Sequence, residues 1–332
     1  MARELFGTDG IRGVANRELT CELALAMGRA ATLWVGPHSR NVKHPRVIIG
    51  RDTRRSGSML EAAFAAGVSS VGGEPVFLGI VPTPAVALTV ELERADLGVV
   101  ISASHNPFDD NGLKVFGRDG FKLPDEVELE LEALMERGGA PVLARGAALG
   151  RARRVEDAVG RYVTHLKSLL DKKYDLDGMK IVVDCANGAA YKAAPTLLRE
   201  LGAEVIALGD APNGLNINRD CGSLHPELAA RTVVATGADL GIALDGDADR
   251  LILIDERGNV VDGDAVLALC ALHMKNEGEL ANDTVVATVM SNMGLERALH
   301  HDGVKVERTQ VGDRYVVQRM REGGFNFGGE QS

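Results

Sequence analysis

The sequence lacks long hydrophobic runs. Polar residues interrupt every apolar stretch, and charged residues make up 25% of the chain. A membrane-spanning helix needs about 20 consecutive apolar residues, and a secretory signal needs an apolar stretch behind its charged start. We therefore expect a cytoplasmic protein without a membrane partner.

Cysteine pairs are also missing. None of the four cysteines forms a Cys-x-x-Cys pair: Cys21, Cys185, Cys221 and Cys270. This spacing argues against a zinc site or a redox pair and predicts buried or inert thiols.

A basic cluster with interleaved aromatic residues is absent as well, and the formal net charge is −10. Because proteins bind nucleic acid by neutralising its phosphates with cationic side chains, we expect no nucleic-acid partner. An acidic protein that handles an anionic substrate must instead gather its few cations in a cleft.

The chain is too long for one ordinary domain. Its 332 residues exceed the roughly 250–300 at which a single hydrophobic core stops growing. Composition changes at residues 138–154, which are rich in Gly, Ala and Arg, and at the polar turn Asp255–Asn259. We expect three domains at 1–150, 151–256 and 257–332.

Short apolar runs alternate with longer segments of helical period, which is typical of layered α/β architecture. The helix signals include a capping Thr20 before a helix to Val35, Ser58 opening the next helix, and Thr83-Pro84 before Ala85–Leu92. The apolar runs predict ten strands: Arg46–Ile49, Pro75–Leu78, Leu97–Ile101, Lys180–Val183, Glu204–Leu208, Leu240–Leu244, Leu251–Ile254, Thr284–Val289, Val304–Glu307 and Phe325–Phe327.

A serine-rich loop follows the run Leu97–Ile101. It contains Ser104-His105-Asn106-Pro107 and reaches Lys114 after an Asn-Gly turn. Ligands bind at the carboxyl ends of strands in open α/β sheets. The Ser104 hydroxyl could carry a phosphoryl group, and His105 or Lys114 could move the proton. A turn that caps the next element is the alternative interpretation.

Three spaced aspartates, Asp245, Asp247 and Asp249, precede Arg250. Alternate carboxylates on an extended loop would point to one side and suit a hard cation. A calcium EF-hand needs glycine where Arg250 stands and a helix where an apolar strand follows. We therefore predict a magnesium ion held by the three aspartates, because without a cation the carboxylates would repel one another.

Two glycine-rich loops carry arginines: Gly7–Gly13, which contains Arg12, and Gly50–Gly57. Each could place an arginine and backbone amides against phosphate oxygens, and Arg12 is the stronger candidate. A turn held by Arg–Asp pairing is the alternative for both loops. The final residues, Gly328 to Ser332, offer a carboxylate, an amide and a hydroxyl that could distinguish the hydroxyls or the amine of a sugar.

Together these motifs resemble the α-D-phosphohexomutase superfamily. The resemblance runs in order along the chain, from the Gly7–Gly13 opening through the Ser104 and Asp245–Arg250 loops to Val311–Tyr315 and Gly329–Ser332. The Gly-Glu-Gln-Ser ending is similar to the branch that acts on glucosamine phosphates.

The resemblance implies consecutive, similar three-layer α/β domains with mixed sheets around a central cleft. It implies a phosphoserine at Ser104, which with Asp245, Asp247 and Asp249 would ligate Mg²⁺. Lys114 matches the general acid/base position, and Arg12 and Arg250 match contacts to the phosphoryl group. The implied substrate-binding positions are Thr309, Gly312, Glu330, Gln331 and Ser332.

The implied reaction interconverts glucosamine 6-phosphate and glucosamine 1-phosphate, a step in amino-sugar metabolism that feeds cell-wall precursors. It passes through a 1,6-bisphosphate, so glucosamine 1,6-bisphosphate or glucose 1,6-bisphosphate is the expected activator. The expected partner is a small phosphosugar, and a homodimer is left open.

Superfamily members continue beyond the last motif into a fourth domain with a phosphate-binding loop, which is absent from this sequence. We therefore expect a fragment cut within the third domain, with weak turnover. Three alternatives remain open: a phosphomannomutase or phosphoglucomutase, an aspartate-based phosphatase, and a sugar-phosphate binding module without turnover.

Overall fold

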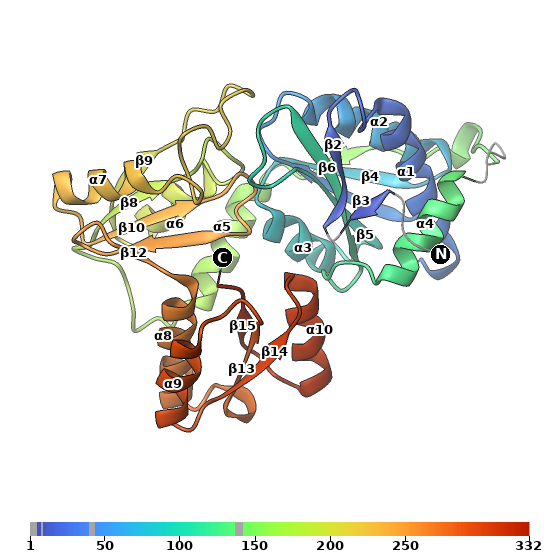
Figure 1. Ribbon diagram of the computed structural model, residues 1–332. Helices are drawn as coiled ribbons and strands as arrows, with labels where there is room; N and C mark the ends of the chain where they lie inside the picture. Colours follow the sequence, from blue (N-terminus) through green and yellow to red (C-terminus); the bar gives the residue numbers. More distant parts are fainter. Residues whose placement is uncertain (1–4, 8, 40–43, 137–141, 332) are drawn as a thin grey trace. The chain divides into compact units, whose positions relative to one another are not determined.

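Residues 5–7, 9–39, 44–136 and 142–331 are described by a computed structural model of the chain (Figure 1). The chain forms two compact units. The larger comprises residues 1–251 with 256–258, and the smaller comprises 252–255 with 259–332.

The first sheet of the larger unit has seven strands in the order β1-β2-β6-β5-β3-β4-β7. Strand β3 pairs parallel with β4 and β5, whereas β6 pairs antiparallel with β5 and β2, so the sheet is mixed. The strands are β1 (Phe6–Gly7), β2 (Gly10–Val14), β3 (Arg46–Arg51), β4 (Glu74–Ile80), β5 (Leu97–Ile101), β6 (Asp110–Gly117) and β7 (Arg153–Arg154).

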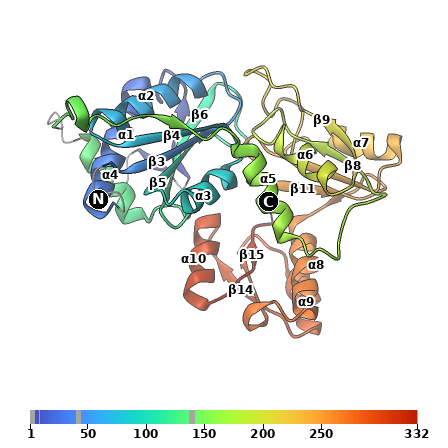
Figure 2. The same ribbon diagram turned by 180° about the vertical axis from the view of Figure 1, so that it is seen from behind.

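Helices cover both faces of this sheet, because its central strands are apolar on both sides. Val47 and Ile49 of β3 belong to the core beneath α1, α2 and α4, whereas Ile48 belongs to the core beneath α3 and α5. Figures 1 and 2 show these two layers from opposite sides. The helices are α1 (Cys21–Val35), α2 (Gly57–Ser70), α3 (Thr83–Leu92), α4 (Asp125–Glu136) and α5 (Ala158–Leu169), with short 3-10 turns at Gly36–His38 and Gly146–Ala148.

Helices α1 and α2 approach closely through two glycines. A Cβ atom on Gly28 would lie 2.3 Å from the Phe64 carbonyl oxygen, and one on Gly67 would lie 2.2 Å from the Leu25 carbonyl oxygen. Each glycine therefore makes room for the backbone of the other helix.

The second sheet has the strand order β12-β11-β10-β8-β9. Strand β8 pairs parallel with β9 and β10, and Ile181 and Val183 of β8 share a core with Leu198 of α6. The elements are β8 (Lys180–Asp184), α6 (Ala193–Glu200), β9 (Glu204–Leu208), α7 (Glu227–Thr236), β10 (Leu240–Leu244), β11 (Leu251–Ile254) and β12 (Val260–Val261).

Within the larger unit, hydrogen bonds join the loops at the ends of the two sheets. The Thr53 hydroxyl donates to the Asn187 carbonyl at 2.6 Å. The Arg55 N–H donates to the Gly214 carbonyl at 3.0 Å. These bonds tie the loop after β3 to two loops of the second sheet.

The smaller unit contains a parallel three-stranded sheet in the order β14-β13-β15. Its core includes Val285 of β13, Leu267 of α8 and Leu299 of α9. The elements are α8 (Gly263–Asn276), a 3-10 turn (Ala281–Asp283), β13 (Thr284–Thr288), α9 (Met293–His301), β14 (Lys305–Thr309), α10 (Asp313–Gly323) and β15 (Gly328–Gly329).

Most expected elements are confirmed, and the α/β class with mixed sheets is correct. The Thr20 hydroxyl oxygen accepts from the Leu23 N–H at the start of α1, as predicted. The predicted Ser58 cap is wrong, because α2 begins at Gly57. The predicted strand Phe325–Phe327 is also wrong, because pairing with β13 falls on Gly328–Gly329. None of the helices in the described part of the chain has the length and apolar character to cross a bilayer.

Candidate active site

Ser104 lies in the turn that follows β5. It is 1% exposed, and its backbone adopts a left-handed φ of 52°, which is uncommon for a residue other than glycine. Its N–H donates to the Ser102 hydroxyl oxygen at 3.0 Å, and its own hydroxyl donates to Asp245 Oδ2 at 2.5 Å. The hydroxyl is therefore aimed at the aspartate loop of the second sheet.

The three aspartates follow β10 in a tight turn. The expected extended loop is wrong, because Ala248 adopts a φ of 55° and its N–H donates to the Asp245 carbonyl at 3.1 Å. The turn nevertheless gathers one oxygen from each of Asp245, Asp247 and Asp249 within 4.8 Å of the others. Among the described residues, no other three carboxylates, imidazoles or thiols come together in this way.

Lys114 supplies the central positive charge. It lies on β6, and its buried Nζ is 2.8 Å from Asp247 Oδ2 and 3.1 Å from Asp249 Oδ2. Asp9 Oδ2 lies 3.0 Å from the same nitrogen and also pairs with Arg12. The two cationic candidates, Lys114 and Arg12, are thus held together by one carboxylate.

Burial and charge set the protonation states of this group. Burial, together with the neighbouring Asp247 and Asp249, raises the pKa of Asp245 well above its usual value. Burial also opposes ionisation of Asp247, but the Lys114 ammonium holds the pKa of that carboxyl below its usual value. Despite burial, the three surrounding carboxylates raise the pKa of Lys114, so it remains an ammonium.

His105 and Arg250 flank the serine. His105 Nδ1 lies 3.3 Å from Ser104 Oγ, and burial together with the Arg250 and Arg12 charges lowers the pKa of the imidazole. His105 is therefore neutral at pH 7. The Arg250 N–H donates to Asp245 Oδ1 at 3.2 Å, while Arg250 as a whole is exposed.

The aspartate turn fits a hard divalent cation. Asp247 Oδ1 is buried and has no hydrogen-bond partner, although Asp247 Oδ2 accepts from both Lys114 and Thr83. One oxygen from each of the three aspartates lies within 4.8 Å of the others, and a divalent cation would offset their mutual repulsion. Carboxylate oxygens are the ligands that magnesium prefers.

Sequence reasoning missed several residues that support this site. The Thr83 hydroxyl at the start of α3 donates to Asp247 Oδ2 at 2.7 Å, and the Thr83 N–H donates to the Asp247 carbonyl at 2.9 Å. Arg54 and Asn218 both donate to carbonyls of the Ser104 turn. The sequence signal of Arg54 pointed to phosphate rather than to backbone, and that of Thr83 pointed only to the start of a helix. Asn218 had no sequence signal.

The smaller unit holds the predicted sugar-recognition residues. Glu330 Oε1 accepts from the Gly312 N–H at 2.8 Å, so these two predicted positions meet. The Thr309 hydroxyl donates to the neighbouring Gln310 carbonyl at 3.0 Å. Gln331 approaches Gly263 so closely that a Cβ there would lie 2.3 Å from the Gln331 carbonyl oxygen. Ser332 lies outside the described residues.

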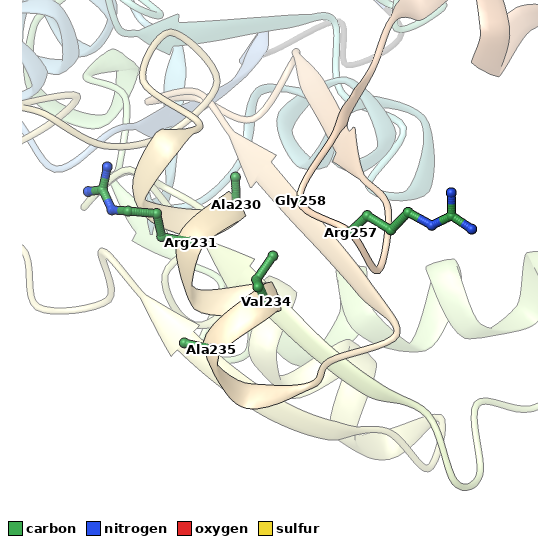
Figure 3. A pocket seen from close by; sticks show the side chains of 6 residues that line it. All are labelled: Ala230, Arg231, Val234, Ala235, Arg257 and Gly258. Atoms are coloured by element: carbon green, nitrogen blue, oxygen red, sulfur yellow. The ribbon is translucent and has the colours of Figure 1, made fainter.

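A separate hollow lies between α7 and the turn at Arg257-Gly258 (Figure 3). Its lining includes Ala230 and Val234 of α7, and the Arg231 and Arg257 side chains extend in opposite directions. Because its charged groups do not converge, this hollow lacks the features of a catalytic site.

The larger unit therefore combines a layered α/β fold with a buried serine hydroxyl, a carboxylate group suited to a divalent cation, and a charged lysine. These are the parts of an enzyme that transfers phosphoryl groups with the help of a metal ion.

The chain belongs to the phosphoglucomutase/phosphomannomutase family. Residues 3–141 match the α/β/α domain I of that family, residues 160–258 match domain II, and residues 262–332 match domain III. The superfamily resemblance drawn from the sequence motifs is confirmed.

Curated relatives match almost the whole chain. A phosphoglucosamine mutase of Geobacter sp. (strain M21) is 57% identical over 99% of this chain and 72% of the relative. A phosphoglucosamine mutase of Ruegeria sp. (strain TM1040) is 58% identical over 99% of this chain and 73% of the relative. A crystal structure of a phosphoglucomutase/phosphomannomutase family protein from Burkholderia thailandensis superposes with a TM-score of 0.84 at 27% identity, over 98% of this chain and 70% of that chain.

Proposed function

We propose that this chain interconverts glucosamine 6-phosphate and glucosamine 1-phosphate through a phosphoserine at Ser104. The observation that carries the proposal is the 2.5 Å hydrogen bond from the Ser104 hydroxyl to Asp245 Oδ2, beside a lysine bound to the other two aspartates. The similarity of the chain to phosphoglucosamine mutases supports the choice of glucosamine phosphates as substrates.

Magnesium, held by Asp245, Asp247 and Asp249 with Ser104 as a fourth ligand, would neutralise charge on the phosphoryl oxygens. Arg12 and Arg250 would add donors to the same oxygens.

The proton would move through Lys114 and His105. When phosphate leaves phosphorylated Ser104 for a sugar hydroxyl, the P–Oγ bond breaks, a P–O bond to the sugar forms, and the sugar hydroxyl loses its proton. The neutral His105 would accept this proton, and the Lys114 ammonium would give one to the departing Ser104 Oγ. In the reverse transfer, Lys114 would take the proton back from Ser104 and His105 would return its proton to the departing sugar oxygen.

Thr309, Gly312, Glu330, Gln331 and Ser332 would recognise the sugar in the smaller unit. The hydrogen bond between Glu330 and Gly312 supports a shared recognition loop. Rates with glucosamine, glucose and mannose 6-phosphates, compared as kcat/KM, test this assignment, and a preference for mannose or glucose would contradict it.

Intact-mass measurement tests the carrier role. The chain is incubated with Mg²⁺ and glucosamine 1,6-bisphosphate or glucose 1,6-bisphosphate, the proposed activators. We expect an added mass of about 80 Da in the wild type and none in Ser104→Ala. Unmodified wild-type protein, or equal modification of the variant, would contradict the proposed function.

Four further expectations stay predictions. The domain boundaries near residues 150 and 256 can be tested by limited proteolysis, the cytoplasmic location by cell fractionation, and a homodimer by sedimentation. The expected absence of nucleic-acid binding can be tested by a filter assay at low salt.

A further inference from the structure

Arg54 lies in the loop after β3, and its side chain is fully buried beneath the Ser104 turn. All three guanidinium nitrogens are engaged by protein oxygens. Nε donates to Asp52 Oδ2 at 2.8 Å, Nη1 donates to two carbonyls, and Nη2 donates to two more. The four carbonyls belong to Ser104, Asn106, Pro107 and Asp110. Because all five N–H groups are used, Arg54 has no donor left for a phosphate.

A second chain of hydrogen bonds holds the other side of Ser104. Asp52 is fully buried, and its Oδ2 accepts from the Ser102 hydroxyl at 2.6 Å as well as from Arg54. The Ser102 hydroxyl oxygen in turn accepts from the Ser104 N–H at 3.0 Å. The Asp52 carboxylate is thus linked to the Ser104 N–H through Ser102 and to the Ser104 carbonyl through Arg54.

Asn218 reaches the same turn from the second sheet. It lies between β9 and α7, and its Nδ2 donates to the Ser104 carbonyl at 2.9 Å and to the Asn106 carbonyl at 3.1 Å. Arg54 Nη2 donates to both of these carbonyls at 2.9 Å. Two side chains from different sheets therefore share the same pair of acceptors.

These contacts surround a residue in an unfavourable backbone conformation. Ser104 has a φ of 52°, and a left-handed serine persists only where its surroundings hold it there. In this conformation the Ser104 hydroxyl meets Asp245 Oδ2.

We propose that Arg54 and Asn218 are positioning residues that hold Ser104 in the left-handed conformation required for phosphoryl transfer. This inference rests on the proposed function of Ser104. Neither residue touches the phosphoryl group, and both act through the Ser104 and Asn106 carbonyls. Lysine cannot replace Arg54, because its three donors radiate from one point and cannot serve a carboxylate and four separated carbonyls.

The test is a time course of Ser104 phosphorylation by glucose 1,6-bisphosphate with Mg²⁺, followed by intact mass at increasing bisphosphate concentration. We expect Arg54→Lys to lower the maximal rate at least about tenfold and Asn218→Ala about threefold. The half-saturating bisphosphate concentration should stay within about twofold of wild type, because neither side chain binds the ligand. The matched control is Arg46→Lys at the opposite end of β3, where Arg46 Nη1 donates to the Glu93 carbonyl at 2.7 Å, and its rate should equal that of wild type.

Circular dichroism melting shows whether each variant is folded. If Arg54→Lys does not fold, the half-buried Asn218→Ala carries the test. Maximal rates equal to wild type in folded Arg54→Lys and Asn218→Ala would overturn the inference. A change in the half-saturating bisphosphate concentration alone, with an unchanged maximal rate, would also overturn it.

The proposed function and this inference can fail separately. If wild-type protein gains no phosphate, the proposed function fails, and crystal structures of the wild type and Asn218→Ala decide the positioning role. We then expect Ser104 in the variant to leave its left-handed φ or its hydroxyl to move away from Asp245. An unchanged Ser104 turn in that variant would overturn the inference.

Discussion

The Ser104 hydroxyl lies 2.5 Å from Asp245 Oδ2, although 141 positions separate the two residues in the sequence. One follows β5 in the first sheet and the other follows β10 in the second. Side chains from other loops hold the Ser104 turn, because Arg54 and Asn218 both donate to the Ser104 carbonyl. The predictions below probe this meeting point and the fold that supports it.

Magnesium should stabilise the chain through the aspartate turn. Bound ligand at about one hundred times its dissociation constant adds about 2.7 kcal/mol to the free energy of unfolding. We expect Asp245→Asn to reduce this gain, measured by urea unfolding with and without Mg²⁺. Asp157→Asn is the control, because Asp157 only caps α5 and its change should leave the magnesium effect intact.

Without magnesium, the same Asp245→Asn variant should be more stable than wild type at pH 7. Burial and the two neighbouring carboxylates raise the folded pKa of Asp245 above its usual 3.8. A raised folded pKa favours the folded state below pH 3.8 and costs stability once the pH exceeds the folded pKa. Urea unfolding of both proteins in EDTA measures the difference, and a less stable variant would contradict this sign.

The Thr83 hydroxyl should matter more than that of a neighbour on the same helix. Thr83→Val removes a 2.7 Å donor to buried Asp247 Oδ2 and should lower the free energy of unfolding by about 1–3 kcal/mol. In the control Thr89→Val, the lost hydroxyl donates to the Ala85 carbonyl of the same helix. That carbonyl still accepts a backbone N–H of α3, so it is not left without a hydrogen bond. Equal losses in the two variants, measured in urea, would argue against support of Asp247 by Thr83.

His105 should make folding stability fall in mild acid. Burial and the Arg250 and Arg12 charges lower its folded pKa below 6.5, so below pH 6.5 the unfolded chain binds more protons than the folded chain. Its stabilising contribution is therefore present above pH 6.5 and is lost as the pH falls through the folded pKa. His105→Gln should lose less stability than wild type between pH 7.5 and 5.5 in urea titrations, and parallel losses would exclude this role.

The α1–α2 contact should reject a methyl group at Gly67. The added Cβ of Gly67→Ala would lie 2.2 Å from the Leu25 carbonyl oxygen, so the helices must separate, at a cost of about 1–3 kcal/mol. Gly57→Ala in the first turn of α2 is the control. There the nearest atom is the flexible Arg51 Cδ at 3.2 Å, and the change should stay within about 1 kcal/mol of wild type. Thermal unfolding compares the two, and a neutral Gly67→Ala would refute the close contact.

Sequence patterns predicted the parallel strands well, because those strands are continuous apolar runs bounded by glycine or charge. Leu97–Ile101, Glu204–Leu208 and Leu240–Leu244 match the observed strands residue for residue. Strand β6 was missed, because Asp110–Gly117 begins with turn-forming residues and buries Asn111 and Lys114. Lys114 contacts the aspartates of the site, whereas Asn111 Nδ2 donates to the Ser56 hydroxyl oxygen at 2.9 Å.

The candidate site was predicted in its chemistry but not in its support. The aspartates, Ser104 and Lys114 stand in motifs with unusual spacing, so the sequence revealed them. Thr83 and Asn218 bind them only after folding brings distant loops together. The Thr83-Pro84 pattern marks only the start of a helix, and no local pattern marks Asn218. The catalytic roles of Ser104, Lys114 and the aspartates stay predictions until phosphorylation is measured.

The bonds from Thr53 to Asn187 and from Arg55 to Gly214 clamp the serine side of the larger unit to its aspartate side. The two turns that carry Ser104 and the aspartates consequently belong to one compact unit, and these two bonds would have to break before the connected loops could separate. Under the proposed function, a phosphosugar would therefore reach Ser104 and the aspartates with the link between their two loops still closed.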